Sequence, residues 1–401
     1  MQTLPTVIVR PGEADRILAG HPWIYHGSIL QLTTEVEDGA VVQIKDHRQR
    51  FLGLGFYNSK SKIRVRWLSR ERLEIDRNFF RQRIVQALEL RKKYLPKATS
   101  FRVVNAESDF LSGLIVDKYE DVLVVQTSSL GMDQRKGLIV EVLREVLSPK
   151  TIFERNEMAS RKFEGLEPIQ GLLFGEPIGA NEIQLNGLRF NINLMEGHKT
   201  GYYLDQQLNY ELVSSYARDG ANVLDCFCFI GGFSLHAARA GAESVLGLDQ
   251  SAEAIQAAEK NAASNHLESR CQFQAQNVFD WLKEQTAAAP NEKVIPRYDL
   301  IILDPPSFTK NRASIDDAMR GYKEIHLRAF KLLKSSGTLA TFCCSHHITA
   351  NLFQEVILAA AFDARRVLRR VATFTQSPDH PVIPAIPETE YLKGFAFELA
   401  L

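Results

Sequence analysis

A short apolar segment that ends in an acid and two prolines constrains the fold of this chain most strongly. Residues 298–303 are Tyr-Asp-Leu-Ile-Ile-Leu, a run rich in branched side chains that predicts a buried parallel strand. Asp304 follows, and Pro305 and Pro306 then remove two backbone donors and favour extended geometry in the residue before them. An ordinary strand with a Pro-Pro turn would share this pattern. The functional alternative places the Asp304 carboxylate at the strand end, where open α/β sheets bind ligands.

A second strand and its turn have the features of a nucleoside site. Residues 221–225 predict a strand ending in Asp225, and the next turn carries Gly231 and Gly232, which let the backbone approach a ligand closely. The following predicted strand, residues 244–249, ends in Asp249, where folds of this kind bind ribose hydroxyls. These segments lack the Gly-x-Gly-x-x-Gly pattern that binds pyrophosphate. A nucleoside without phosphates is therefore favoured over a dinucleotide.

Strands and helices alternate throughout the C-terminal half, which predicts the α/β class. Helix 252–265, strand 271–274, helix 324–334 and strand 338–341 extend the pattern, with a turn expected at 335–337. A doubly wound, Rossmann-like parallel sheet is the natural arrangement for such an order. We predict three domains: a small β-barrel at 1–73, a central α/β domain at 74–187 and the doubly wound domain at 188–401. Polar residues in the central domain are assigned no chemistry.

The N-terminal module is basic. Residues 1–73 hold 11 Lys/Arg and 7 Asp/Glu, a net charge of +4 that the remaining chain balances. Short β-like segments alternate with turns there, and Lys62, Arg64 and Arg66 alternate along one of them as residues on one strand face do. This spacing suits contacts with phosphates. An edge strand kept soluble by its charges is the alternative.

The amino-acid composition limits which classes of protein the chain can belong to. The chain has 45% hydrophobic and 24% charged residues, and neither a membrane-spanning run nor a signal-peptide pattern is evident, so we expect a cytoplasmic protein. Five cysteines at unequal spacing fit neither a disulfide framework nor a zinc site, and no metal is expected. The oligomeric state stays open, a homodimer included.

Together these motifs resemble class I S-adenosylmethionine-dependent methyltransferases, and more closely the RlmI-like group of ribosomal RNA large-subunit cytosine-C5 methyltransferases. The likeness extends from His21-Pro22-Trp23 to the segment 390–395, and its most specific parts are 198–206, 231–233, 304–308 and 344–347. It implies that the N-terminal module is an RNA-binding PUA domain and that the partner is large-subunit ribosomal RNA. Family members usually have Asp where Asn277 stands. The residues that the resemblance assigns to S-adenosylmethionine are Lys199, Thr200, Tyr203, Asp225, Phe227, Gly231, Gly232, Asp249, Asn277, Val278 and Asp304.

Cytosine C5 methylation requires a reactive thiol, because carbon 5 becomes nucleophilic only after a thiolate adds at carbon 6. The predicted nucleophile is Cys344, with Asp304 holding the N3/N4 edge of the ring and His346 favouring the thiolate. Cys343 is expected to be structural, since adjacent strand residues face opposite sides.

Three other functions remain open at this point. A base N-methyltransferase of the guanine-N7 type shares the Asp-Pro-Pro-x-Phe loop but needs no thiol. A noncatalytic ribosome-assembly factor would use only the basic module, which leaves the glycine turn and the acids unexplained. A dinucleotide-dependent oxidoreductase is disfavoured by the missing phosphate loop.

Overall fold

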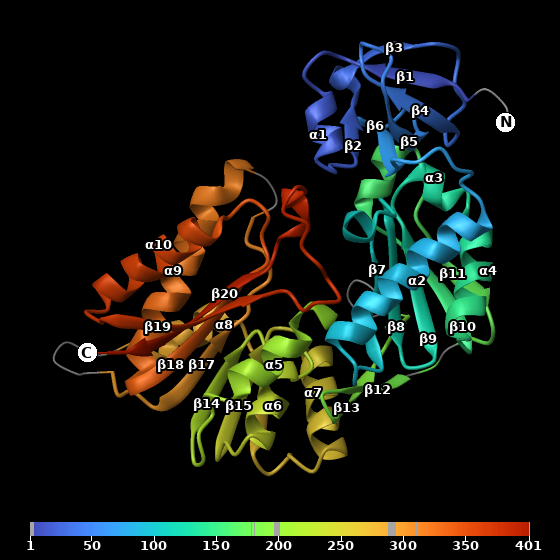
Figure 1. Ribbon diagram of the computed structural model, residues 1–401. Helices are drawn as coiled ribbons and strands as arrows, with labels where there is room; N and C mark the ends of the chain where they lie inside the picture. The colour runs from blue at the N-terminus through green and yellow to red at the C-terminus, as the bar shows by residue number, and fades with distance from the viewer. Residues whose placement is uncertain are drawn as a thin grey trace. The chain divides into compact units, whose positions relative to one another are not determined.

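The computed structural model describes residues 4–177, 179, 181–195, 201–287, 294–309 and 312–400. The chain divides into two compact units, drawn in Figure 1. The first contains Met1–Ile183, Ile192–Leu204 and Pro378–Thr389, and the second contains Gln184–Asn191, Asp205–Ser377 and Glu390–Leu401. The two N-terminal domains expected from the sequence therefore share one unit, together with two segments from the region that follows them.

The N-terminal part of the first unit is a six-stranded sheet in the order β2-β6-β5-β4-β1-β3. Alternate residues of β4 are buried, and Val42 and Ile44 join Val65 and Trp67 in one apolar core. This period of two is what a sheet with one covered face requires. The elements are β1 (Thr6–Val9), α1 (Ala14–Leu18), β2 (Trp23–Tyr25), β3 (Ile29–Leu32), β4 (Val41–Lys45), β5 (Phe51–Tyr57) and β6 (Ile63–Ser69).

The central part of this unit is a five-stranded sheet in the order β11-β10-β9-β8-β7. Asp76 caps its long helix α2 by accepting the Phe79 N–H at 3.0 Å, as an N-cap acid should. Two helices of this part, α3 and α4, are separated by a break at Gln134 and Arg135. The elements are α2 (Arg77–Tyr94), β7 (Ser100–Asn105), β8 (Leu114–Tyr119), β9 (Val122–Thr127), α3 (Leu130–Asp133), α4 (Lys136–Leu147), β10 (Thr151–Asn156) and β11 (Ile169–Phe174).

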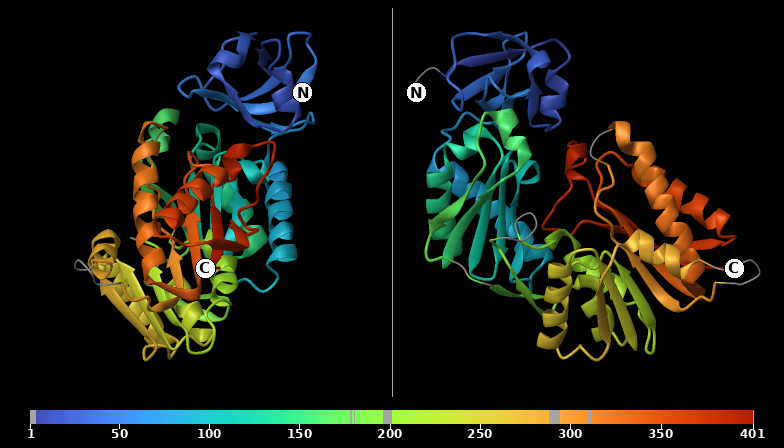
Figure 2. Two further views of the ribbon diagram at one scale, coloured as in Figure 1. Left: turned by 90° about the vertical axis from the view of Figure 1, so that its left-hand side faces the viewer. Right: turned by 180° about the vertical axis from the view of Figure 1, so that it is seen from behind.

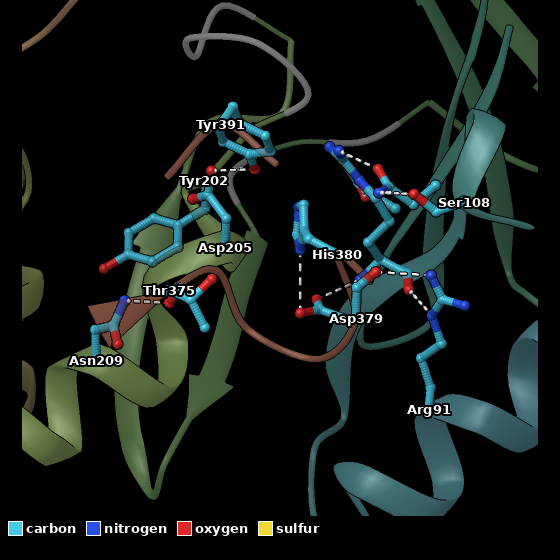
Figure 3. Close-up of polar contacts among 12 residues, drawn as sticks. Arg91, Ser108, Tyr202, Asp205, Asn209, Thr375, Asp379, His380 and Tyr391 are labelled. Atoms are coloured by element: carbon cyan, nitrogen blue, oxygen red, sulfur yellow. Dashed lines mark hydrogen bonds and ion pairs between the residues drawn. The ribbon is translucent and has the colours of Figure 1, made fainter. Parts of the chain in front are cut away.

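Hydrogen bonds from two arginines hold the segment Pro378–Thr389 in this unit. Arg91 lies on α2, and its guanidinium donates to both carboxylate oxygens of Asp109 at 2.6 and 2.8 Å. The same group donates to the Asp379 carbonyl oxygen at 2.7 Å, as Figure 3 shows. The Asp379 carboxylate accepts the Arg102 N–H at 2.9 Å. The segment thus completes the hydrogen bonding of a guanidinium that is 1% exposed.

The second unit is built on a seven-stranded sheet in the order β16-β15-β14-β17-β18-β20-β19. The pairs among β14 to β18 are parallel, and β20 pairs antiparallel with both neighbours. Helices α8, α9 and α10 pack on one face of the sheet, where their buried residues belong to a single apolar cluster. Helices α5, α6 and α7 lie on the opposite face of the sheet (Figure 1 and Figure 2). This is the doubly wound arrangement that the alternation predicted.

The remaining elements include the strands and helices predicted for this half, although α9 begins nine residues before the predicted helix 324–334 and ends two residues before the end of that range. They are β12 (Asn181–Leu185), β13 (Leu188–Ile192), α5 (Gln207–Ser214), β14 (Asn222–Cys226), α6 (Gly232–Arg239), β15 (Ser244–Asp249), α7 (Ala252–Ser264), β16 (Cys271–Ala275), α8 (Val278–Gln285), β17 (Tyr298–Leu303), α9 (Ile315–Leu332), β18 (Leu333–Cys343), α10 (Ala350–Asp363), β19 (Leu368–Thr375) and β20 (Lys393–Leu399). The expected turn at 335–337 instead lies within β18, where Ser336 has φ 62° and the register with β17 shifts. The polar Ser-Ser-Gly sequence marks a bulge there.

Candidate active site

The carboxyl ends of four adjacent parallel strands bring the predicted site residues to one edge of the sheet. Cys226 on β14 pairs with Leu248 on β15 and with Leu303 on β17, and Leu303 pairs with Thr341 on β18. Asp249 ends β15, Asp304 follows β17 directly, and Cys344 follows the last residue of β18. Because these strands run in the same direction, the acids and the thiol share the edge at which doubly wound sheets bind ligands.

The turn between β14 and α6 is held in an unusual backbone conformation. Phe227, Phe229 and Gly231 have positive φ angles of 66°, 49° and 89°. Asp249 fixes this turn, because its Oδ2 accepts the Phe229 N–H at 3.0 Å while its Oδ1 accepts the Ser251 N–H at 3.0 Å. Left-handed geometry at non-glycine residues is costly, and its concentration at one turn is typical of ligand-binding sites.

Asp225 is a buried acid under this turn. Its Oδ2 accepts the Ser234 hydroxyl at 2.6 Å, whereas its Oδ1 has no partner among the described residues. Burial raises the pKa of Asp225 to about 7, with the nearby Asp249 carboxylate adding to the shift and the Ser234 hydrogen bonds opposing it. A carboxyl group with such a perturbed pKa at a strand end marks a candidate functional site.

Asn277 and Val278 lie where β16 leads into α8. The Asn277 Oδ1 caps the helix by accepting the N–H groups of Phe279 and Asp280 at 2.9 and 3.3 Å. Val278 is buried in the adjacent core. The rings of Phe227 and Phe279 lie 6.4 Å apart and form an aromatic wall next to the turn. The sequence did not single out Phe279, although an aromatic residue two positions after a capping residue is a recognisable signal.

Asp304 is held by contacts from two directions. Its backbone N–H donates to the Cys226 carbonyl at 3.4 Å, and its Oδ2 accepts the Gln206 Nε2–H at 3.1 Å. The loop after it is linked to the loop after β18, because the hydroxyls of Thr309 and Ser345 share a hydrogen bond of 2.5 Å. Gln206, Thr309 and Ser345 were not recognised as site residues from the sequence.

The two neighbouring cysteines differ in exposure. Cys343 is 0% exposed and its Sγ accepts the Tyr322 hydroxyl at 3.4 Å, whereas Cys344 is partly exposed. Lys393 anchors the turn that follows, since its ammonium donates to the carbonyls of Ser345 and Ile348 at 2.6 and 2.8 Å. Burial lowers the pKa of Lys393, and Cys343, Cys344 and Glu390 oppose that shift. A cation beside a thiol stabilises its thiolate form.

The other three cysteines are unsuited to catalysis. Cys226, Cys228 and Cys271 are buried. Burial raises the pKa of Cys226 and Cys228 well above the ordinary value and that of Cys271 to about 12. Thiols in such surroundings stay protonated and inert. Among the described residues, no group of His, Cys, Asp and Glu is arranged to hold a metal ion.

Two family models match the chain. A PUA-like domain matches residues 7–70, and an S-adenosylmethionine-dependent methyltransferase matches residues 165–389. Ribosomal RNA large subunit methyltransferase I of Alteromonas mediterranea is 37% identical over 397 residues, which cover 98% of this chain and 98% of the relative. Its counterpart in Pseudoalteromonas atlantica is 38% identical over 392 residues, covering 97% and 98%. The chain belongs to the ribosomal RNA large subunit methyltransferase I family.

Solved structures agree with the fold of this methyltransferase family. A chain assigned as a methyltransferase and complexed with SAH has a TM-score of 0.81 at 21% identity, and the match covers 98% of this chain and 99% of the other. A chain from Streptococcus mutans, assigned as an S-adenosylmethionine-dependent methyltransferase, has a TM-score of 0.80 at 20% identity over the same shares. At this identity the similarity establishes the fold alone.

The described residues fit S-adenosylmethionine, the cofactor of the family. Asp225 offers a buried oxygen that has no partner within the described part of the chain, beneath a turn whose backbone is shaped by Gly231. Each Asp249 oxygen accepts one N–H, and a carboxylate oxygen can accept a second donor such as a ribose hydroxyl. Lys199 and Thr200 lie outside the described residues. Tyr203 is described and half-buried.

The three predicted RNA-binding residues differ in how far their side chains are exposed to solvent. Lys62 is exposed and Arg64 is half-buried beside His26, whose Nδ1 lies 3.2 Å from the Arg64 Nε. Arg66 is only 9% exposed, and its guanidinium donates to Glu164 and Ser112 at 2.8 and 3.1 Å. Arg66 is thus placed differently from the prediction of three accessible cations. Ser112 and Glu164 of the central part of the unit cover the Arg66 guanidinium, and the register between β2 and β6 skips Arg64, so strand alternation alone does not relate the two side chains.

Within the described part of the chain, no helix is both long and apolar enough to cross a lipid bilayer.

Proposed function

We propose that this chain forms 5-methylcytosine in large-subunit ribosomal RNA, with Cys344 as the nucleophile and Asp304 holding the base. The substrate follows from the curated relatives, whose name is ribosomal RNA large subunit methyltransferase I. One observation supports carbon 5 as the position that is methylated. Cys344 is partly exposed beside the Asp304 strand end, while the four other cysteines are buried. An N-methyltransferase would have no use for a thiol at this place.

The cofactor residues are proposed from position. The turn with Gly231 and Gly232, above Asp225, would hold the methionine part of S-adenosylmethionine, and Asp249 would bind the ribose. Asn277 and Val278 would contact the adenine, with Phe227 as an apolar wall. Asn277 already uses its Oδ1 as a helix cap, so any contact with the adenine amino group would share that oxygen. The bound cofactor would supply an electrophilic methyl group on a sulfonium, whose sulfur would keep the S–CH3 electron pair and leave as a thioether.

The residues at the strand ends would then act in sequence. The Cys344 thiolate adds to carbon 6 of cytosine, which makes the C5–C6 electron pair available at carbon 5 for the methyl group. Asp304 orients the N3/N4 edge of the ring by accepting a hydrogen bond from the N4 amino group. A base removes the proton from carbon 5, the C–H electron pair restores the double bond, and the thiolate leaves carbon 6. Lys393 is positioned near the thiol and would favour both its attack and its departure as thiolate.

We assign RNA docking to the N-terminal module, with Lys62 and Arg64 as its phosphate contacts. Lys62 is exposed, and the guanidinium of Arg64 is only partly covered. Arg66 is excluded from this role because its charge is already neutralised by Glu164 within a buried network. The order of PUA domain (1–73), central domain (74–187) and methyltransferase domain (188–401) remains our functional division of the chain.

The test uses RNA that carries 5-fluorocytosine at the methylated nucleotide, which is first mapped by mass spectrometry of ribosomal RNA from cells with and without the gene. Fluorine cannot leave carbon 5 as a proton would, so the wild-type enzyme should stall as a covalent protein–RNA complex. Cys344→Ala should form no complex and no product, yet bind S-adenosylmethionine as tightly as the wild type.

Cys343→Ala is the matched control, because it removes the same atom from the neighbouring, buried position. It should retain substantial activity. Methylation by Cys344→Ala at a near-normal rate would refute the C5 mechanism and favour the base N-methyltransferase. If Cys343→Ala alone is inactive, the mechanism stands but the nucleophile is the other cysteine.

A further inference from the structure

A chain of buried amides leads from a backbone carbonyl to Asp304. Asn209 lies on α5, and its Nδ2 donates to the Thr375 carbonyl oxygen at 2.9 Å, a contact drawn in Figure 3. The same nitrogen donates to the Gln206 Oε1 at 2.6 Å. Gln206 in turn donates from Nε2 to the Asp304 Oδ2 at 3.1 Å. Gln206 and Asn209 are each 3% exposed, so water does not compete for these contacts.

The direction of every hydrogen bond in this chain is fixed at its far end. A backbone carbonyl can only accept, so the Asn209 side chain must turn its nitrogen towards Thr375. The same nitrogen donates its second hydrogen to Gln206, which must therefore accept through its side-chain oxygen. The Gln206 nitrogen is therefore left facing Asp304. An amide could otherwise sit in either of two orientations, and here the backbone selects one.

The anchor of this chain is rigid as well. Gln206 ends a short helical turn, Leu204–Gln206, next to Asp205. The Asp205 carbonyl accepts the Ser377 N–H at 2.8 Å, and its carboxylate Oδ2 accepts the Tyr391 hydroxyl at 2.6 Å (Figure 3). These contacts hold the turn against the segments that follow β19 and precede β20. The Gln206 amide is thus fixed both in orientation and in position.

A fixed donor at Asp304 has a consequence for base recognition. An N–H aimed at a carboxyl oxygen suits the ionised form, which can only accept hydrogen bonds. The exocyclic N4 group of cytosine is a donor, whereas uracil has an acceptor oxygen at that position. We propose that Gln206 and Asn209 are positioning residues that keep Asp304 an acceptor and so make the enzyme select the amino group of cytosine. This inference rests on the proposed function, in which Asp304 holds the base.

A purely structural role is the alternative, because the same amides also join α5 to the end of β19. The two roles differ in what they predict for the substrate. A structural defect lowers activity on every base alike. Loss of a positioned acceptor lowers kcat/KM for a base that has the amino group and leaves kcat/KM for a base without it nearly unchanged.

The experiment therefore compares two RNAs, one with cytosine at the mapped nucleotide and one with pyrimidin-2-one, which lacks the N4 group but keeps the C5–C6 double bond. The rate of methyl transfer at limiting RNA gives kcat/KM for each. Gln206→Met removes the hydrogen-bond donor but keeps the length of the side chain. Asn209→Asp replaces the donating nitrogen by a carboxylate oxygen, so the Gln206 amide must reverse and point its nitrogen at residue 209. In both variants the preference for cytosine should fall by roughly 10- to 100-fold, the usual worth of a hydrogen bond to a charged group.

Thr286→Val is the control. Thr286 is also buried and hydrogen-bonded, to the Leu282 carbonyl at 2.7 Å. It caps the carboxyl end of α8, which lies between two parallel strands and so ends at the opposite edge of the sheet. This variant should keep the wild-type preference, and all proteins should bind S-adenosylmethionine equally.

The outcomes separate this inference from the proposed function. An unchanged cytosine preference in Gln206→Met, with the wild type active on carbon 5, overturns the role of the amides and leaves the mechanism intact. A wild type that methylates no carbon 5 overturns the proposed function itself. If Asn209→Asp fails to fold, Gln206→Met decides alone.

Discussion

Replacing Asp225 with Asn should remove a pH-dependent cost to the stability of the second unit. Burial raises the pKa of Asp225 from 3.8 to about 7. Between these values the folded protein holds a proton that the unfolded chain has released, so stability falls as the pH rises from about 4 to about 7. A shift of about 3 pKa units corresponds to roughly 4 kcal/mol. Above pH 7 both states are ionised, and the full cost remains.

The variant should lack this slope. Its free energy of unfolding, measured relative to that of the wild type, should improve by up to roughly 4 kcal/mol between pH 4 and pH 8. Asn keeps an oxygen for the Ser234 hydroxyl, so the one hydrogen bond that Asp225 accepts from a side chain survives the substitution. The oxygen without a partner is replaced by a neutral NH2 group.

Urea titrations at several pH values, without cofactor, measure this difference. Fluorescence of Trp281 on α8 reports on the second unit when Trp23 and Trp67 of the first unit are replaced by Phe. Asp299→Asn controls for the loss of a carboxylate, since Asp299 lies on the adjacent strand but is partly exposed. A wild-type slope in the Asp225→Asn protein between pH 4 and pH 7 would refute the reasoning.

Three further outcomes test the site and the scaffold. Asp249→Ala should weaken S-adenosylmethionine binding by at least 10-fold, because it removes the ribose acceptor and releases the turn that it holds; equal affinity in calorimetry would contradict the assignment. Replacing Lys62 and Arg64 by Ala should flatten the dependence of log affinity for RNA on log salt by roughly 1.5 to 2 units, and an unchanged slope would place the RNA surface elsewhere. Arg91→Leu should destabilise the first unit by roughly 3 to 5 kcal/mol, because Asp109 stays buried without its partner; denaturant unfolding would show a smaller loss if water reaches that site.

The sheet edge could be predicted because its signals are local. Buried parallel strands appear as uninterrupted apolar runs, and the sequence placed those that end in Asp225, Asp249 and Asp304 close to their true bounds. Parallel neighbours bring their carboxyl ends together, so the acids had to share an edge. Cys343 is buried like its neighbours at the end of β18, whereas Cys344 is partly exposed just beyond the strand, so the choice of Cys344 as the nucleophile stays a prediction.

The contacts that orient these groups could not be predicted, because their partners are distant in sequence. Gln206 lies 98 residues from Asp304, and Arg66 lies 98 residues from Glu164. Alternation along a strand predicts which side chains share a face of the sheet, but it does not predict which other element covers that face. For Arg66 the covering element turned a candidate phosphate contact into a buried ion pair.

The pairing of Arg91 with Asp379 also has a consequence for synthesis on the ribosome. The two residues are 288 positions apart, yet both belong to the first unit. At typical elongation rates, roughly 15 to 60 s pass between the emergence of one and the emergence of the other. Throughout that interval the nascent N-terminal half lacks the carbonyl that completes the guanidinium's hydrogen bonding, although it already carries Asp109. Translation of the segment that carries Asp379, rather than translation of the first half, is therefore the step after which this half can reach its final stability.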